Sequence, residues 1–140
     1  MFADDTVCEM LPGQETVVCQ RRILIVDDDP QQAEVLAYRL GEQGFQTMMA
    51  HRGEDAIRMA RSSHPHLVLL DLRLPDVYGL SVCEQLTETP ATCGIPVIIL
   101  SGMESPNIIR QTRAAGCEYF VRKPYDPSAL LVLIQHTLAS

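Results

Sequence analysis

The sequence predicts an α/β fold in which helices cover both faces of one five-stranded parallel sheet, a doubly wound arrangement. From Arg22 onward, short continuous apolar runs alternate with amphipathic segments. The runs are too short for helices and too apolar for strands with one face in water, which favours buried parallel strands. Five strand–helix units in succession require right-handed crossovers, and these place helices on both faces of the sheet.

Five apolar runs are the expected strands, and a predicted helix follows each of them. The strands are predicted at residues 23–26, 47–50, 67–70, 97–100 and 119–121. The helices are predicted at residues 30–42, 54–61, 80–88, 106–115 and 127–138. Asp29 and Asp126 each precede a proline, which pairs an N-cap acceptor with a favoured first helical residue. Gly44 and Gly116 are expected to end helices.

Residues 1–20 mix acidic, apolar and turn-forming residues without a sustained period, which is typical of a flexible extension. We expect an extension at residues 1–20 and one domain at residues 21–140, since 140 residues is the length of a single domain. The apolar residues of the extension leave open a short helix or strand that docks on the domain. Met1 is expected to be the native start, and whether an effector domain follows Ser140 is open.

Composition and charge argue against several classes of protein. The net charge is −7 and the basic residues form no dense cluster, so nucleic acid is not expected as a direct partner. The chain has no apolar run long enough to span a membrane and no basic signal sequence at its start, which favours a cytoplasmic protein. The five cysteines form no CxxC pair, so neither disulfides nor a zinc site is expected. The four histidines share no spacing and are expected to have surface roles.

Polar residues follow the predicted strands at the point where each strand ends. Residues 27–29 are all aspartate, Asp71 follows the third strand, and Ser101 and Lys123 follow the fourth and fifth. Ligands of parallel α/β sheets bind beyond these carboxyl ends. Clustered carboxylates are usually accommodated by a raised pKa or a hard divalent cation, and Mg²⁺ suits an oxygen-only cluster. The acidic turn VDDDP disfavours nucleotide or flavin binding. With Lys123, the only lysine in the chain, the cluster suits phosphoryl transfer to a carboxylate.

Four segments resemble the receiver domain of two-component response regulators, the CheY-like superfamily, in order and spacing. They are ILIVDDDP, LVLLDLRLPDVYGL, VIILSG and YFVRKPYDP, and the resemblance covers residues 22–138. It implies a flavodoxin-like sheet with strand order 2-1-3-4-5. It also implies a signalling switch that takes a phosphoryl group from a histidine kinase or phosphotransfer protein and then changes its partner-binding face.

The same resemblance implies roles for single residues. Asp71 is expected to accept the phosphoryl group. Mg²⁺ is expected to bind Asp28, Asp71 and the backbone carbonyl of Arg73 directly, and Asp27 largely through water. The other implied roles are phosphate binding by Leu72, Ser101, Gly102 and Lys123, catalysis by Ser101 and Lys123 beside Asp71, switching by Ser101 and Phe120, and a cis peptide between Lys123 and Pro124.

Two other functions stay open. An aspartate-nucleophile phosphatase also passes through an aspartyl phosphate, but such enzymes usually have a second acid two residues after the nucleophile, where this chain has Arg73. An interaction module that works without phosphorylation could have the same fold. Taken singly, each polar residue also has an ordinary structural explanation as a cap, turn or core residue. These explanations do not account for such residues following four different strands, where one shared site is expected. Because the second acid of a phosphatase is missing, we expect a non-enzymatic switch at that site.

The last predicted helix is apolar around its whole circumference at residues 129–134, since successive residues lie about 100° apart. With one face of this helix on the sheet, Val132 and Leu133 are expected to point outward. We expect a homodimer or a downstream effector there, on the face of the fourth helix, fifth strand and fifth helix. The N-terminal extension or a segment beyond Ser140 could instead cover this strip.

Overall fold

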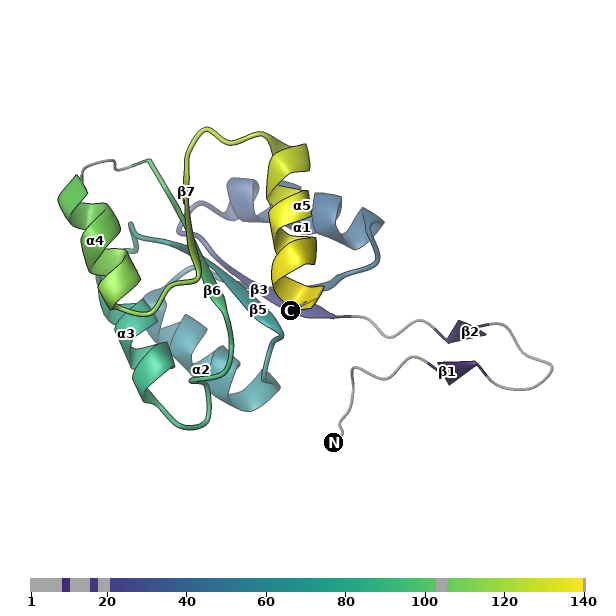
Figure 1. Cartoon of the computed structure of the whole chain (residues 1–140), viewed down its shortest axis with the longest axis horizontal. Coiled ribbons are helices and arrows are strands. Elements are labelled where there is room, and N and C mark those ends of the chain that lie inside the picture. Colours follow the sequence, from purple (N-terminus) through teal and green to yellow (C-terminus); the bar gives the residue numbers. More distant parts are fainter. Residues whose placement is uncertain (1–8, 11–15, 18–20, 103–105, 140) are drawn as a thin grey trace.

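A parallel sheet of five strands lies at the centre of the fold (Figure 1). The computed structural model describes residues 9–10, 16–17, 21–102 and 106–139. In chain order the strands are β3 (Arg22–Val26), β4 (Gln46–Ala50), β5 (Leu67–Asp71), β6 (Val97–Ser101) and β7 (Tyr119–Arg122). Their order in the sheet is β4-β3-β5-β6-β7, and every neighbouring pair is parallel. The predicted fold class and strand order are confirmed.

Five helices cover the two faces of this sheet. They are α1 (Pro30–Glu42), α2 (Gly53–Ser63), α3 (Gly79–Glu88), α4 (Pro106–Ala114) and α5 (Pro127–Ala139). The helices α1 and α5 lie on one face, and α2, α3 and α4 lie on the other (Figure 1). Each predicted helix is present, and its ends differ from the prediction by at most two residues.

Alternation of side chains along the central strands builds a separate hydrophobic core on each face of the sheet. Leu24 and Val68 pack with α2, α3 and α4, whereas Ile25 and Leu69 pack with α1 and α5. Every residue of β5 and β6 is buried. Because both faces are covered by helices, these strands read as continuous apolar runs in the sequence.

The sequence predicts that all five strands are buried, but the two edge strands are only partly buried. One edge is β4, where Met49 is 36% exposed. The other edge is β7, and none of its four residues is fully buried. An edge strand has a neighbour on one side only, so fewer side chains cover it.

The helix ends follow the predicted capping. Asp29 and Asp126 each accept a hydrogen bond from the backbone amide two residues ahead, at the starts of α1 and α5. Gly44 and Gly116 follow α1 and α4 with φ values of +93° and +98°. Glycine adopts this left-handed conformation readily because it has no Cβ.

Within the first 20 residues the structure describes two short strands. β1 (Glu9–Met10) and β2 (Thr16–Val17) pair antiparallel with each other in a sheet separate from the central one. The rest of the predicted extension, residues 1–8, 11–15 and 18–20, lies outside the described residues, so its flexibility and its docking stay predictions. Among the helices described, none has both the length and the apolar character that crossing a membrane requires.

Candidate functional site

The carboxyl ends of β3 and β5 bring three aspartates together. These strands are neighbours, and Val26 pairs with Leu70, so the residues that follow emerge side by side. The possible ligand atoms of Asp27, Asp28 and Asp71 all lie within 4.8 Å of one another. Asp27 is 8% exposed and Asp71 is 9% exposed, whereas Asp28 is open to solvent. Two buried carboxylates therefore share this edge of the sheet with an exposed one.

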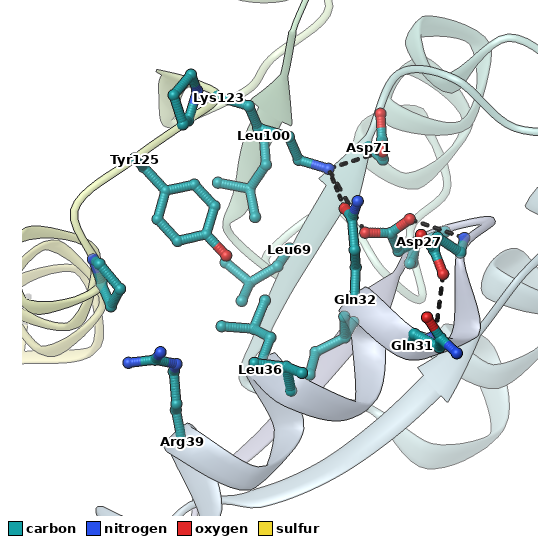
Figure 2. A pocket seen from close by; sticks show the side chains of 16 residues that line it. Asp27, Gln31, Gln32, Leu36, Arg39, Leu69, Asp71, Leu100, Lys123 and Tyr125 are labelled. Carbon is teal, nitrogen blue, oxygen red and sulfur yellow. Dashed lines mark hydrogen bonds and ion pairs between the residues drawn. The ribbon is translucent and has the colours of Figure 1, made fainter.

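The ammonium group of Lys123 lies between the two buried carboxylates (Figure 2). Its Nζ atom is 3.0 Å from Asp71 Oδ2 and 3.5 Å from Asp27 Oδ2. It also lies 3.4 Å from the amide oxygen of Gln32, in the first turn of α1. A compact ammonium on a flexible stem can contact several oxygens at once, which suits this position better than a planar guanidinium.

Burial and charge act on the pKa values of this group in opposite directions. Burial raises the pKa of the Asp27 carboxyl, and the Asp29 amide and the Lys123 charge oppose this only in part. Burial acts to lower the pKa of Lys123, but the hydrogen bond and charge of Asp71, with those of Asp27, outweigh it and raise that pKa. Lys123 is therefore positively charged, and its closer partner is Asp71.

Backbone amides orient both buried carboxylates. The Asp29 amide donates to Asp27 Oδ1 at 2.9 Å, and the Arg73 amide donates to Asp71 Oδ1 at 3.0 Å. Lys123 contacts the Oδ2 atom of each. Because an ionised carboxylate has about four lone-pair sites, each side chain is fixed in orientation and can still accept a cation.

The donor set fits a hard divalent cation. Mg²⁺ prefers oxygen ligands and usually keeps several waters. The three aspartates border a pocket of about 510 Å³, which Arg73, Gly102 and Lys123 also line. The pocket has room for a cation with part of its water shell and for a small anion beside it.

Other residues singled out in the sequence surround this pocket. Leu72 and Ser101 are fully buried, and Gly102 is exposed. The Lys123 amide donates to the Ser101 carbonyl at 2.8 Å, which joins the ends of β6 and β7. The peptide between Lys123 and Pro124 is cis.

Phe120 and the α5 residues lie farther from the carboxylates. Phe120, on β7, is half-buried against the core beneath α2, α3 and α4. Val132 is 65% exposed. Leu133 is half-buried against the other core, so the expectation that it points outward is wrong. It lies one residue before the buried Ile134, on the margin of the helix face that meets the sheet.

Two contacts at this site come from residues that the sequence did not single out for it. One is the Gln32 amide beside Lys123. The other is His51, whose Nδ1 donates to the backbone carbonyl of Asp27 at 2.9 Å. His51 is half-buried, so the expected surface role does not describe it. The position of Gln32, in the helix turn directly after the aspartates, is the one signal that could have identified it.

An apolar pocket of about 720 Å³ continues from this site between α1 and the segment that joins β7 to α5. Figure 2 shows Asp27 and Asp71 at one end and Arg39 and Tyr125 at the other. Burial raises the pKa of the Tyr125 hydroxyl. The carboxylates therefore face a pocket that is open to solvent, and apolar side chains border them on the α1 side.

Comparison with known sequences identifies relatives along most of the chain. Residues 23–135 match the family described as response regulator receiver domain. The chain is 35% identical over 119 residues to the DNA-binding response regulator MtrA of Mycolicibacterium smegmatis, which covers 85% of this chain and 51% of MtrA. It is 35% identical over 118 residues to protein PilH of Pseudomonas aeruginosa, which covers 84% of this chain and 98% of PilH. The chain thus spans about half the length of MtrA and nearly all of PilH.

Solved structures of similar proteins have the same fold. A CheY-like receiver domain protein from Methanospirillum hungatei superposes with a TM-score of 0.81 at 27% identity, covering 86% of this chain and 94% of that chain. The signal receiver domain of a histidine kinase from Syntrophus aciditrophicus gives 0.79 at 32% identity, covering 85% and 90%. The likeness therefore includes the sequence as well as the backbone.

Proposed function

Because the chain belongs to the response regulator receiver domain family, we propose that Asp71 is the residue that accepts the phosphoryl group in this phosphoacceptor switch. One observation carries the assignment. The Asp71 carboxylate ends a central strand and lies 3.0 Å from the ammonium of the chain's only lysine, Lys123. The ligand atoms of Asp27, Asp28 and Asp71 lie within 4.8 Å of one another, so a single divalent cation can contact all three. Such a group of charges can take up a divalent cation and a phosphoryl group together.

The proposed metal is Mg²⁺, with Asp28, Asp71 and the backbone carbonyl of Arg73 as direct ligands and Asp27 acting largely through water. When bound, the ion supplies positive charge that offsets the charge on the phosphoryl oxygens during transfer. Asp28 is exposed and can reach the ion from the mouth of the pocket. The amide contacts to Asp27 and Asp71 hold those two carboxylates in orientation.

In the proposed step, an oxygen of the Asp71 carboxylate bonds to phosphorus while the bond between phosphorus and the donor breaks. The leaving group, a histidine nitrogen or an acyl oxygen, departs with the electron pair. Lys123 is charged because its neighbouring carboxylates raise its pKa, and its ammonium pairs with the phosphoryl oxygens. The Ser101 hydroxyl and the amides of Leu72 and Gly102 supply further hydrogen bonds.

The proposed readout runs from the Asp71 pocket to the face formed by α4, β7 and α5. Phosphorylation adds about −1.5 to −2 charge, which draws Ser101 toward the phosphoryl group. Phe120 then moves from its half-buried position to a buried one. Because Phe120 and α4 pack on the same core, this movement changes the outer surface of that face.

The proposed partners are a histidine kinase or phosphotransfer protein as donor, and a second copy of the chain or a downstream effector as recipient. Val132, the exposed large apolar residue described on α5, is the proposed contact on that helix. The relative MtrA is named as DNA-binding, but this chain spans about half of it and has a net charge of −7. We therefore propose no direct contact with nucleic acid. The free thiols of the described cysteines suit the reducing cytoplasm.

The test is incubation of the whole chain with acetyl phosphate and Mg²⁺, followed by measurement of the intact mass. The wild type is expected to gain one phosphoryl group. Asp71→Asn is expected to gain none, because an amide is a poor nucleophile and a weaker metal ligand. Asp55→Asn removes an exposed carboxylate on α2 and serves as the matched control, which should react like the wild type. An unlabelled wild type, or a fully labelled Asp71→Asn, would refute the assignment.

We propose that the chain is not a phosphatase for separate substrates. The residue two positions after Asp71 is Arg73, which is exposed and cannot act as a general acid or base at neutral pH. Incubation with p-nitrophenyl phosphate and Mg²⁺ should give no turnover beyond that of Asp71→Asn. Sustained turnover by the wild type alone would favour an enzyme.

A further inference from the structure

A residue from a distant loop caps the N-terminus of α2. Arg52 occupies the N-cap position in an extended conformation, and its side chain makes no capping hydrogen bond. Asp76, in the loop between β5 and α3, supplies the acceptors instead. Its Oδ1 accepts from the Gly53 amide at 2.7 Å, and its Oδ2 accepts from the Glu54 amide at 3.0 Å. Both hydrogen bonds, and the one from the Glu54 amide most strongly, hold the pKa of the Asp76 carboxyl below its usual value.

The loop that carries Asp76 is the one that directly follows Asp71. At its start, the Arg73 amide donates to Asp71 Oδ1. At its end, the Gly79 amide donates to the Leu72 carbonyl at 2.9 Å. Both ends of the loop are therefore tied to the end of β5, and Asp76 ties the part between them to α2.

The start of α2 is also tied to the other buried carboxylate residue. His51, two residues before Gly53, donates to the Asp27 carbonyl at 2.9 Å. The Asp27 amide donates to the Ala50 carbonyl at 3.0 Å. A continuous path of contacts therefore runs from Asp27 through His51 and the start of α2 to Asp76, and along the loop to Asp71.

We propose that Asp76 is a positioning residue for the phosphorylation site. By joining the loop to α2, it fixes the backbone at Arg73 and the spacing between Asp71 and Asp27. The inference rests on the proposed function, in which these residues hold Mg²⁺. Because Mg²⁺ demands near-ideal octahedral geometry, its affinity is sensitive to small changes in ligand spacing. Asp76 itself does not enter the ion's pocket and acts through the loop alone.

Asp76→Ala removes both hydrogen bonds to α2 and tests the proposal directly. The dissociation constant for Mg²⁺, measured by calorimetric titration of the whole chain, is expected to rise about tenfold, a typical cost of losing a residue that orients metal ligands. The labelling rate with acetyl phosphate should fall by a similar factor at low Mg²⁺ and recover at saturating Mg²⁺. Asp76→Asn keeps one accepting oxygen, so its Mg²⁺ affinity should lie between those of Asp76→Ala and the wild type.

Two further variants separate the positioning role from simple helix capping. Arg52→Ser, added to Asp76→Ala, provides a local cap, because serine is a favoured N-cap residue in extended conformation. This pair should recover stability while Mg²⁺ binding stays weak. Thr92→Val removes a buried hydrogen bond to the Leu86 carbonyl in the segment that joins α3 to the amino end of β6. It should lower stability and leave Mg²⁺ affinity unchanged.

The outcomes distinguish this inference from the proposed function. Wild-type affinity in Asp76→Ala, or recovery of Mg²⁺ affinity together with stability on adding Arg52→Ser, would overturn the positioning role. A wild-type chain that binds no Mg²⁺ and takes no label would refute the proposed function itself. If Asp76→Ala alone does not fold, the capped pair and Asp76→Asn carry the same comparison.

Discussion

Lys123 and the proposed Mg²⁺ would both bring positive charge to the same two carboxylates. The Lys123 ammonium contacts the Oδ2 atoms of Asp71 and Asp27. Like charges repel within a pocket of low effective dielectric. The lysine is therefore expected to weaken binding of the proposed Mg²⁺ and to favour binding of the proposed phosphoryl group.

Replacing the lysine should reveal this competition. Lys123→Met is expected to bind Mg²⁺ several-fold more tightly in calorimetric titration, because one of two cations is removed from the pocket. It should also lose the coupling between labelling and partner binding, since no ammonium pairs with the phosphoryl group. Arg58→Gln removes an exposed cation on α2 and should leave the affinity unchanged. Weaker Mg²⁺ binding by Lys123→Met would contradict the competition.

The single residues that directly follow a buried strand could be predicted from the sequence. Asp27, Asp71 and Lys123 each come after an apolar run, and the carboxyl ends of parallel strands meet at one edge. The contact of His51 could not be predicted, because it depends on how the β4–α2 turn sits against the sheet. For Gln32 the only signal was its position in the helix turn after the aspartates. A glutamine in a helix and a lone histidine have many ordinary roles.

At the scale of elements, α3 begins directly against the end of β5. A Cβ added at Gly79 would lie 2.5 Å from the Asp71 carbonyl oxygen and 2.6 Å from the Leu72 Cα. These are backbone atoms that cannot move aside without shifting the strand end. Gly79 therefore allows the helix to start beside the acidic cluster.

Gly79→Ala is expected to lower the free energy of unfolding by about 1–3 kcal/mol, the usual cost of overpacking. Urea denaturation would measure it. Gly41→Ala is the matched control in α1, since nothing lies within 4 Å of the added Cβ. That substitution should instead raise stability by about 0.5–1 kcal/mol, because glycine is unfavourable in a helix. Equal effects of the two substitutions would refute the close approach.

The exposed side of α5 supports a prediction about association. Val132 is 65% exposed on α5, a helix made mostly of apolar residues. It is the residue proposed to contact a second copy of the chain or an effector. Val132→Asp is expected to reduce the apparent mass of the labelled chain in light scattering, relative to the labelled wild type. Val35→Asp, at a comparably exposed valine of α1, should not. A monomeric labelled wild type would argue for an effector in place of a second copy.

The elements were more predictable than the contacts between them. Apolar runs and capping residues identified every strand of the central sheet and every helix of the described part, with small errors at the ends. The cap of α2 could not be predicted, because Arg52 gives no signal and the accepting carboxylate belongs to Asp76, 23 residues after Gly53. The sequence pattern also could not show that Leu133 turns toward the core, since its neighbours on α5 are equally apolar.

At the scale of the whole molecule, metal binding and folding should be linked. A ligand that binds only the folded chain stabilises it by about 2.7 kcal/mol at one hundred times its dissociation constant. The midpoint of thermal unfolding is therefore expected to rise by several degrees in Mg²⁺ and to return on adding a chelator. Asp28→Ala should lose this response, because Mg²⁺ needs at least two carboxylates to displace part of its water. An equal rise in that variant would remove Asp28 from the site.

The sheet separates the molecule into two cores, one beneath α1 and α5 and the other beneath α2, α3 and α4. The two clusters share no side chain among the described residues. Substitutions that lie more than about 7–10 Å apart and share no partners have nearly additive effects on stability. The outer surface of α1 and α5 can therefore change to recognise a new partner without compensating changes on the surface of α2, α3 and α4, and the reverse also holds. The proposed phosphorylation site lies at the strand ends between these surfaces, so this architecture would let a lineage change one partner and retain the chemistry.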